Sequence, residues 1–228
     1  MSDLTLSTLD RDGALQEAIG RVWGGSRADL LRGAAVGGAA MLGVLAVPER
    51  GVAATTNDVD ILNYALTLEY LQASFYTETE RIGALDTTAA KRAVRRLGGV
   101  ERAHVRALRK VLGKSAVKRP FFNFQGTTEN ERKFLRTAVA FEDLAVAAYK
   151  GQAALIDSKQ VLAAAVSIHS VEARHAAWMR HLFGIVPAEN AFDEPASKAA
   201  ILEIVASTRF IASKSPVTAG RGEPRYTG

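Results

Sequence analysis

The sequence predicts an all-α protein, an antiparallel four-helix bundle followed by a short fifth helix near its C-terminal end. Only 7% of the 228 residues are aromatic, and long stretches rich in Ala, Leu, Arg and Glu favour helices over a β-sandwich. Four such stretches follow one another from Asn57 onward. The first and last connections between them are short and the middle one is long, which is one of the known topologies of four-helix bundles.

The first hairpin of the bundle is expected from two helices, over about residues 58–82 and 87–112. Their short connection makes them antiparallel neighbours. The pair Gly98-Gly99 lies inside the second helix and indicates either a kink or close packing. The expected caps and stops are Asn57 or Asp58 for the first helix, and Asp86 and Gly113 for the second.

The second hairpin is expected from helices over about residues 128–156 and 159–183. The long crossover between the two hairpins covers about residues 113–127 and contains a proline and three phenylalanines. A short fifth helix is expected over about residues 196–211, with Pro195 in the place of a first helical residue.

The N-terminal part of the chain has a different composition, which indicates an export signal. An uncharged run at residues 33–47 is too short to span a bilayer as a helix, which needs ~20 residues. Basic residues before this run and small residues at 52–54 are typical of export signals. The segment resembles a twin-arginine (Tat) signal peptide in which Ala28 stands in place of the second arginine. The alternative is an uncleaved amphipathic arm.

The chain is therefore divided into an export signal or arm at 1–54, a bundle domain at 55–212 and a disordered tail at 213–228. Cleavage after Ala54 would leave no stable membrane span. The protein is expected in the periplasm, in the cell envelope or outside the cell. It is expected in the cytoplasm if the N-terminal segment is not a signal.

The absence of cysteine restricts the chemistry that the chain can perform. It excludes disulfides, thiolate zinc sites, iron–sulfur clusters and thiol catalysis. Any metal site must therefore use histidine and carboxylate ligands. The available histidines are His104, His169, His175 and His181.

The net charge of +5 is compatible with an anionic partner, but the basic residues are scattered. The predicted helix at 87–112 is especially rich in lysine and arginine. A solvated outer face is the simplest explanation for it, and contact with an anionic surface is the alternative. We expect no nucleic-acid partner.

Two of the histidines have a glutamate three residues earlier, as Glu101 with His104 in the second helix and Glu172 with His175 in the fourth. Residues three apart share one face of a helix, so each pair can bind the same ion. Both pairs lie in the middle of an apolar stripe. A carboxylate buried there is costly unless it is paired or binds a metal.

The first and third helices each place one glutamate on their apolar stripe, Glu69 and Glu142. Each of them is followed two turns later, on the same face, by a tyrosine, Tyr76 or Tyr149. These tyrosines are expected to pack in the core. The alternative is that they hydrogen-bond to ligand carboxylates or take part in redox chemistry. The two hairpins thus form a weak internal repeat.

Folding the hairpins together places six side chains in one layer of the core, and we predict a site there for two divalent metal ions, iron or manganese. The ions would cancel the charge of four carboxylates, while the histidines bind as neutral ligands. Glu101 and Glu172 could bridge the two ions. The alternative is a bundle whose glutamates pair with arginines. The predicted ligands are Glu69, Glu101, His104, Glu142, Glu172 and His175.

This ligand pattern, one glutamate from each of two helices and Glu-x-x-His from the other two, is that of ferritin-like di-metal proteins. The stretches that match are Asn57–Tyr70, Phe141–Tyr149, Val171–Ala176 and Ala191–Asp193. On these stretches, the chain from about residue 57 to 211 resembles the ferritin-like domain family that includes the desiccation-related proteins. The resemblance implies the fold and metal chemistry, and an export signal is frequent in the family. It does not imply one reaction or substrate.

Two functions remain open. The first is a dinuclear metal oxidoreductase that reacts with O₂, a peroxide or Fe(II), in a ferroxidase-like or manganese-catalase-like reaction. The second is a non-enzymatic envelope or stress-protection protein with a structural or vestigial metal site. The expected partners are the metal ions and a small oxidant. Assembly into a homo-oligomer stays open, and no catalytic residue is assigned.

Overall fold

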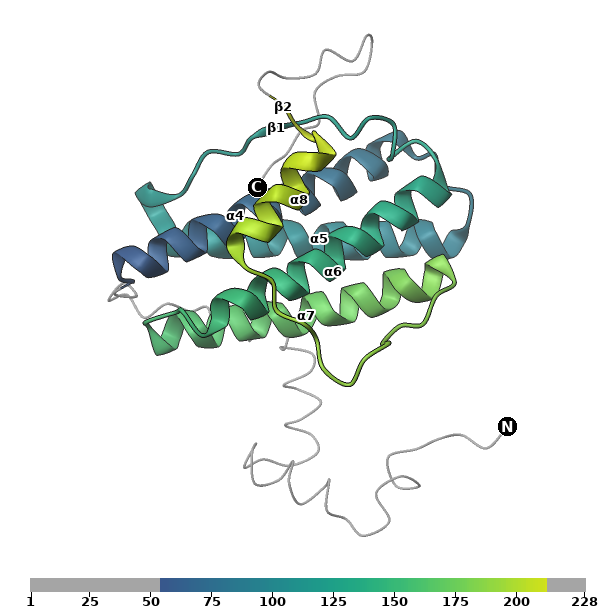
Figure 1. Ribbon diagram of the computed structural model, residues 1–228. Coiled ribbons are helices and arrows are strands. Elements are labelled where there is room, and N and C mark those ends of the chain that lie inside the picture. Colours follow the sequence, from purple (N-terminus) through teal and green to yellow (C-terminus); the bar gives the residue numbers. More distant parts are fainter. Residues whose placement is uncertain (1–53, 213–228) are drawn as a thin grey trace, which may run out of the picture. The chain divides into compact units, whose positions relative to one another are not determined.

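The computed structural model describes residues 54–212. This part of the chain contains five α-helices, a single 3₁₀ turn and one pair of very short strands (Figure 1). The predicted tail at 213–228, and the predicted export signal apart from its last residue, lie outside the described residues. The helices are α4 (Thr56–Ile82), α5 (Thr88–Leu112), α6 (Glu131–Ala153), α7 (Lys159–Phe183) and α8 (Lys198–Thr208); the strands are β1 (Phe121–Phe122) and β2 (Ile211–Ala212).

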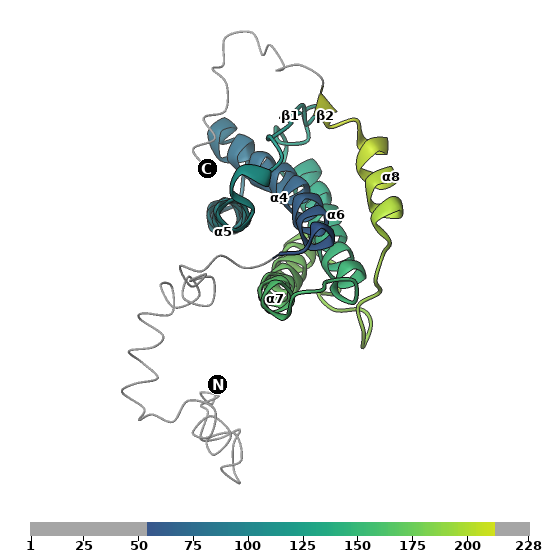
Figure 2. The ribbon, with the colours of Figure 1, turned by 90° about the vertical axis from the view of Figure 1, so that its left-hand side faces the viewer.

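The first four helices form an antiparallel four-helix bundle, so the predicted fold class is confirmed. Helices α4 and α5 make one hairpin and α6 and α7 the other, and the long connection between α5 and α6 runs along the length of the bundle (Figure 1). Seen along the helices, α8 lies on the side of α4 and α6, and α5 and α7 lie on the opposite side (Figure 2). The core between the helices is where the candidate site forms.

The N-terminal caps of α4 and α5 are threonines, so the predicted caps are wrong by one to three residues. Thr55 caps α4 in a reciprocal capping box with Asp58, whose carboxylate accepts from the Thr55 backbone N–H. Asn57 instead donates its amide to the carbonyl of Leu155 in the other hairpin. Thr87 caps α5 through its hydroxyl oxygen.

The fifth helix is shorter than predicted at both ends. Ser197 caps α8, so Pro195 lies before the helix and is not its first residue. At the other end, Arg209 adopts a left-handed conformation (φ 55°) and stops the helix. The chain then pairs β2 with β1, the strand in the crossover, with Phe122 opposite Ile211. The sequence pattern did not predict these two strands.

Helix α5 is continuous through Gly98-Gly99, and the reason for the first glycine is close packing. A Cβ atom on Gly98 would lie 2.9 Å from the Cβ of Tyr76 on α4 and would also meet the Glu80 carboxylate. A Cβ on Gly99 would meet nothing within 4 Å. Gly98 therefore lets α5 approach α4 closely beside Tyr76.

Phenylalanines from distant parts of the chain join the bundle to the segments outside it. Phe75 of α4 stacks on Phe134 of α6, with ring centroids 5.3 Å apart. Phe124 of the crossover packs edge-on against Phe75 and against Phe210, which follows α8. The crossover thus contributes to the core instead of forming a solvated loop. Within residues 54–212, we find no helix with the length and apolar character needed to cross a membrane.

Candidate metal centre

The structure brings the six predicted ligand residues together in the middle of the bundle. Their ligand atoms form two groups, and the atoms within each group lie within 4.8 Å of one another. Each group contains one histidine, and both groups contain Glu101 and Glu172. The first group is completed by Glu69 and His104, and the second by Glu142 and His175. That these residues bind metal ions stays a prediction.

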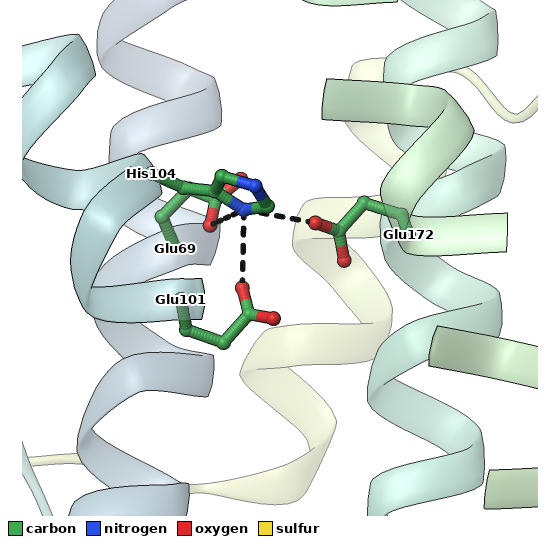
Figure 3. A group of neighbouring side chains, drawn as sticks. All are labelled: Glu69, Glu101, His104 and Glu172. Carbon is green, nitrogen blue, oxygen red and sulfur yellow. Dashed lines mark ion pairs between the residues drawn. The ribbon is translucent and has the colours of Figure 1, made fainter. Parts of the chain in front are cut away.

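In the first group, three carboxylates from three helices surround the Nδ1 atom of His104 (Figure 3). The distances from this nitrogen are 3.3 Å to Glu69 Oε2, 3.5 Å to Glu101 Oε2 and 3.0 Å to Glu172 Oε1. Helices α4, α5 and α7 therefore contribute to one small cluster of oxygen and nitrogen atoms.

The second group has the same construction around the Nδ1 atom of His175. This nitrogen lies 2.8 Å from Glu101 Oε1, 3.6 Å from Glu142 Oε2 and 3.9 Å from Glu172 Oε2. The two imidazole rings are stacked, with centroids 6.4 Å apart. Helix α6 contributes Glu142 to this group, as α4 contributes Glu69 to the first group.

Glu101 and Glu172 each present one carboxylate oxygen to each group. Glu101 turns Oε2 toward His104 and Oε1 toward His175, and Glu172 turns Oε1 toward His104 and Oε2 toward His175. A carboxylate that offers its two oxygens to two neighbouring positions can bridge two ions. Glu69 and Glu142 each serve only one group.

The site is almost completely shielded from solvent. All four glutamates are 0% exposed, and His104 and His175 are 9% and 6% exposed. Apart from the close contacts with one another described above, Glu69 Oε2, both oxygens of Glu101 and of Glu172, and both Nδ1 atoms have no hydrogen-bond partner. Buried polar atoms without partners are costly, whereas divalent cations would satisfy all of them. The residues therefore fit a pair of metal ions.

The protonation equilibria of the metal-free cluster reflect four carboxylates crowded around two imidazoles. Burial raises the pKa of Glu69 to about 7, against the effect of His104. Burial and the charges of Glu101 and Glu69 raise the pKa of Glu172 well above its usual range. Burial acts in the same direction on Glu101, but His104 and His175 outweigh it and hold its pKa well below the usual range.

Both histidines carry raised pKa values for the same reason. Burial alone would lower them, but the carboxylates around each ring outweigh it, raising the pKa of His175 to about 10 and that of His104 well above its usual range. Without metal ions, protons on the two imidazoles compensate part of the carboxylate charge.

The two tyrosines hydrogen-bond crosswise to glutamates of the opposite hairpin. Tyr149 of α6 donates to Glu69 Oε1 at 2.6 Å, and Tyr76 of α4 donates to Glu142 Oε1. Of the two sequence interpretations, the structure therefore favours hydrogen bonding to the predicted ligands. These hydrogen bonds fix the Oε1 atom of Glu69 and of Glu142 and leave the Oε2 atom of each directed at the centre of the site.

Gln72 is a residue at the site that the sequence interpretation missed. Its Nε2 donates to Glu142 Oε2 at 3.2 Å, and the residue is 2% exposed. The signal was its spacing, because Gln72 follows Glu69 by three residues, as each predicted histidine follows its glutamate. The corresponding position after Glu142 is Ala145. Only one of the two groups therefore has this additional donor.

The remaining histidines and acids around the site lie outside it. Asp143, the neighbour of Glu142, pairs with Arg180 at 2.8 Å. His181 is exposed, and His169 is half-buried with an Nε2 atom that lacks a hydrogen-bond partner. Among residues 54–212, the basic groups that lie against the four site glutamates are those of His104 and His175, and no arginine pairs with these glutamates.

Comparison with known proteins gives one finding on the family. The model of a family described as "Ferritin-like domain" matches residues 57–184, which is more than half of the chain and includes all six residues of the two groups. A comparison with curated proteins found no match.

Proposed function

The chain belongs to the ferritin-like domain family, and on this basis we propose that it binds two divalent ions, iron or manganese, for redox chemistry with O₂, peroxide or Fe(II). The observation that carries the proposal is that Glu101 and Glu172 each turn one oxygen to each of two His-containing groups. Two divalent ions would balance the four glutamates, with neutral imidazoles as the remaining ligands.

When bound, a pair of such ions supplies one-electron redox steps and Lewis acidity to a small oxidant. The chain's own residues define where this chemistry takes place. Glu69 and His104 would hold one ion, and Glu142 and His175 the other. Tyr149 orients the Glu69 carboxylate through its hydroxyl group, and Tyr76 does the same for Glu142. The apolar bundle around these residues keeps bulk water out.

The first experiment is metal analysis of the full chain after removal and reloading of Fe(II) or Mn(II). We expect two equivalents per chain for the wild type, and a loss of at least one equivalent in Glu101→Gln and in Glu172→Gln. Glu203→Gln is the matched control, since Glu203 is exposed on α8. A wild type that holds less than one equivalent, and whose thermal stability ignores chelators, would contradict the proposal.

Assays of Fe(II) oxidation and of peroxide removal then distinguish the two reactions. A protein that retains two ions but performs neither reaction would support the second candidate, a non-enzymatic envelope or stress-protection protein with a structural site. The near-complete burial of the six residues is the observation that supports a structural role for the site.

We propose further that residues 1–54 are an export signal of the Tat type and that the protein belongs with the desiccation-related members of the family. The composition of this segment and the motifs quoted above support the proposal. Fractionation of cells that produce the full chain, followed by N-terminal sequencing, tests it. Mature protein outside the cytoplasm that begins at Thr55 is the expected result. Uncleaved protein confined to the cytoplasm would contradict it.

A further inference from the structure

The outer face of α5 carries a dense cluster of cations without acidic residues. Eleven of the chain's 29 lysines and arginines lie between Lys91 and Arg119, together with only one of its 24 acidic residues, the buried Glu101. We call the exposed basic residues of α5 the cationic face. They are Lys91, Arg92, Arg95, Arg96, Arg106, Arg109 and Lys110.

Of the two helices that flank α5, α7 adds to this face, whereas α4 contributes Glu80, which neutralises Arg102 alone. Helix α7 lies with α5 on the side of the bundle away from α8 (Figure 2), and its single acidic residue, Glu172, is buried in the metal centre. Arg174 on α7 is exposed. Within residues 54–212, Arg102 of α5 pairs with Glu80, whereas Arg92, Arg95 and Arg96 form no ion pair.

We propose that the cationic face binds a membrane surface of anionic phospholipid. Lys91 and Lys110 are about 28 Å apart along the helix axis, so the cations cover a long, straight stretch that a flat array of phosphates can match. Basic residues close to an anionic bilayer each contribute about fivefold to the affinity. Apart from Thr88, the exposed residues among the cations are small, Ala89 and Gly99, so binding would be electrostatic and peripheral.

Nucleic acid is the other polyanion with a comparable charge density. Proteins that read DNA sequence use arginine to contact guanine and asparagine or glutamine to contact adenine, and no exposed residue of α5 carries an amide side chain. A sequence-independent contact with a nucleic acid would not need them. The preference for lipid over such a contact rests on the export proposed above, whereas the cationic face itself does not depend on it or on the metal centre.

The test is co-sedimentation of the full chain with vesicles of phosphatidylcholine alone and of phosphatidylcholine mixed with phosphatidylglycerol. We expect binding to the anionic vesicles only, decreasing with added salt because ions screen the attraction. The triple variant Arg92→Gln/Arg95→Gln/Arg96→Gln should bind on the order of 100-fold more weakly. The control Arg132→Gln/Lys133→Gln/Arg136→Gln removes three exposed cations from α6 instead and should bind nearly as the wild type does.

Several outcomes would overturn the proposal. Equal binding to both kinds of vesicle, or equal binding by the two triple variants, would show that the cationic face is not the contact. Tighter binding to duplex DNA than to anionic vesicles at the same salt concentration would assign the face to nucleic acid. Failed secretion in the fractionation experiment, with intact vesicle binding, would contradict the export proposal alone.

Discussion

Gln72 makes the two halves of the candidate metal centre chemically different. Glu142 accepts hydrogen bonds on both of its oxygens, from Tyr76 and from Gln72, whereas Glu69 accepts one, from Tyr149, and keeps Oε2 without a donor. A carboxylate whose lone pairs are shared with hydrogen-bond donors is a weaker metal ligand. The ion next to Glu69 and His104 should therefore bind more tightly than the ion next to Glu142.

The substitution Gln72→Leu tests this difference, because leucine keeps the bulk and removes the donor. A hydrogen bond to a charged group is worth roughly 1.5–3 kcal/mol, so the weaker ion should bind on the order of tenfold more tightly in the variant. Titration with Mn(II), followed by electron paramagnetic resonance, measures both steps. Gln152→Leu, at a second buried glutamine that lies on α6, is the control and should leave both steps unchanged.

Metal binding at neutral pH should release protons from the histidines. The pKa of His175 is raised to about 10 in the metal-free site by the neighbouring carboxylates, against burial, so its ring is protonated at pH 7 and must become neutral before Nδ1 can bind an ion. The apparent affinity should consequently rise with pH between about 6 and 9. Calorimetry in buffers of different ionisation enthalpy counts the released protons. A heat of binding that is the same in every buffer would contradict the prediction.

At the scale of the helices, the two adjacent glycines of α5 should respond to the same substitution in opposite ways. Gly98→Ala would push a methyl group against Tyr76 and should cost about 1–3 kcal/mol of stability. Gly99→Ala faces open space in a helix interior and should stabilise the protein by roughly 0.5–1 kcal/mol. Denaturant unfolding of both variants gives the two values. Equal effects would mean that the close approach of α4 and α5 does not restrict Gly98.

The start of α5 depends on a residue from another helix. Glu131 of α6 accepts hydrogen bonds from the backbone N–H groups of Asp86 and Thr87, at 2.6 and 2.7 Å. These hydrogen bonds outweigh the effect of burial and lower the pKa of Glu131. Because the folded-state pKa is lowered, the stabilisation is present above the ordinary pKa of about 4.5 and is lost as the pH falls through the folded-state value.

Glu131→Ala should therefore lower the free energy of unfolding by about 1 kcal/mol at pH 7, the typical net contribution of an intramolecular hydrogen bond. The difference from the wild type should shrink in acid, when the wild-type carboxylate is protonated as well. Glu129→Ala, at an exposed neighbour, is the control. Thermal unfolding over a pH series measures all three proteins, and a difference that is the same at every pH would contradict the electrostatic part of the explanation.

At the scale of the whole molecule, the sequence pattern predicted the helices and the clustering of the six site residues, because both depend on the spacing of residues along a helix. Helix α7 covers the predicted residues, Lys159–Phe183, and the six residues meet because their spacing fixes their depth on each helix. The pairing of Phe122 with Ile211 was not predictable, since two-residue strands form only through a contact between distant segments. The hydrogen bond of Gln72 was missed for a similar reason, because its acceptor lies on another helix.

Metal removal should loosen both hairpins together. The first group takes its ligands from α4, α5 and α7, and the second from α5, α6 and α7, so each ion would connect the two hairpins. Bound ligand at 100 times its Kd stabilises a fold by about 2.7 kcal/mol per site. Calorimetry with and without chelator should show a lower Tm for the metal-free protein. Hydrogen exchange should then increase in all four bundle helices, and a change confined to one hairpin would contradict the prediction.

The crosswise tyrosine bonds also bear on the ancestry of such a chain. Tyr76 and Tyr149 each reach the glutamate of the opposite hairpin, so two separate copies of one identical hairpin would make the same pair of contacts across a dyad. In such a dimer every substitution appears twice. A single chain can carry a different residue in each repeat, as it does with Gln72 and Ala145. Fusion of the repeats thus permits two unlike ion positions within one buried centre.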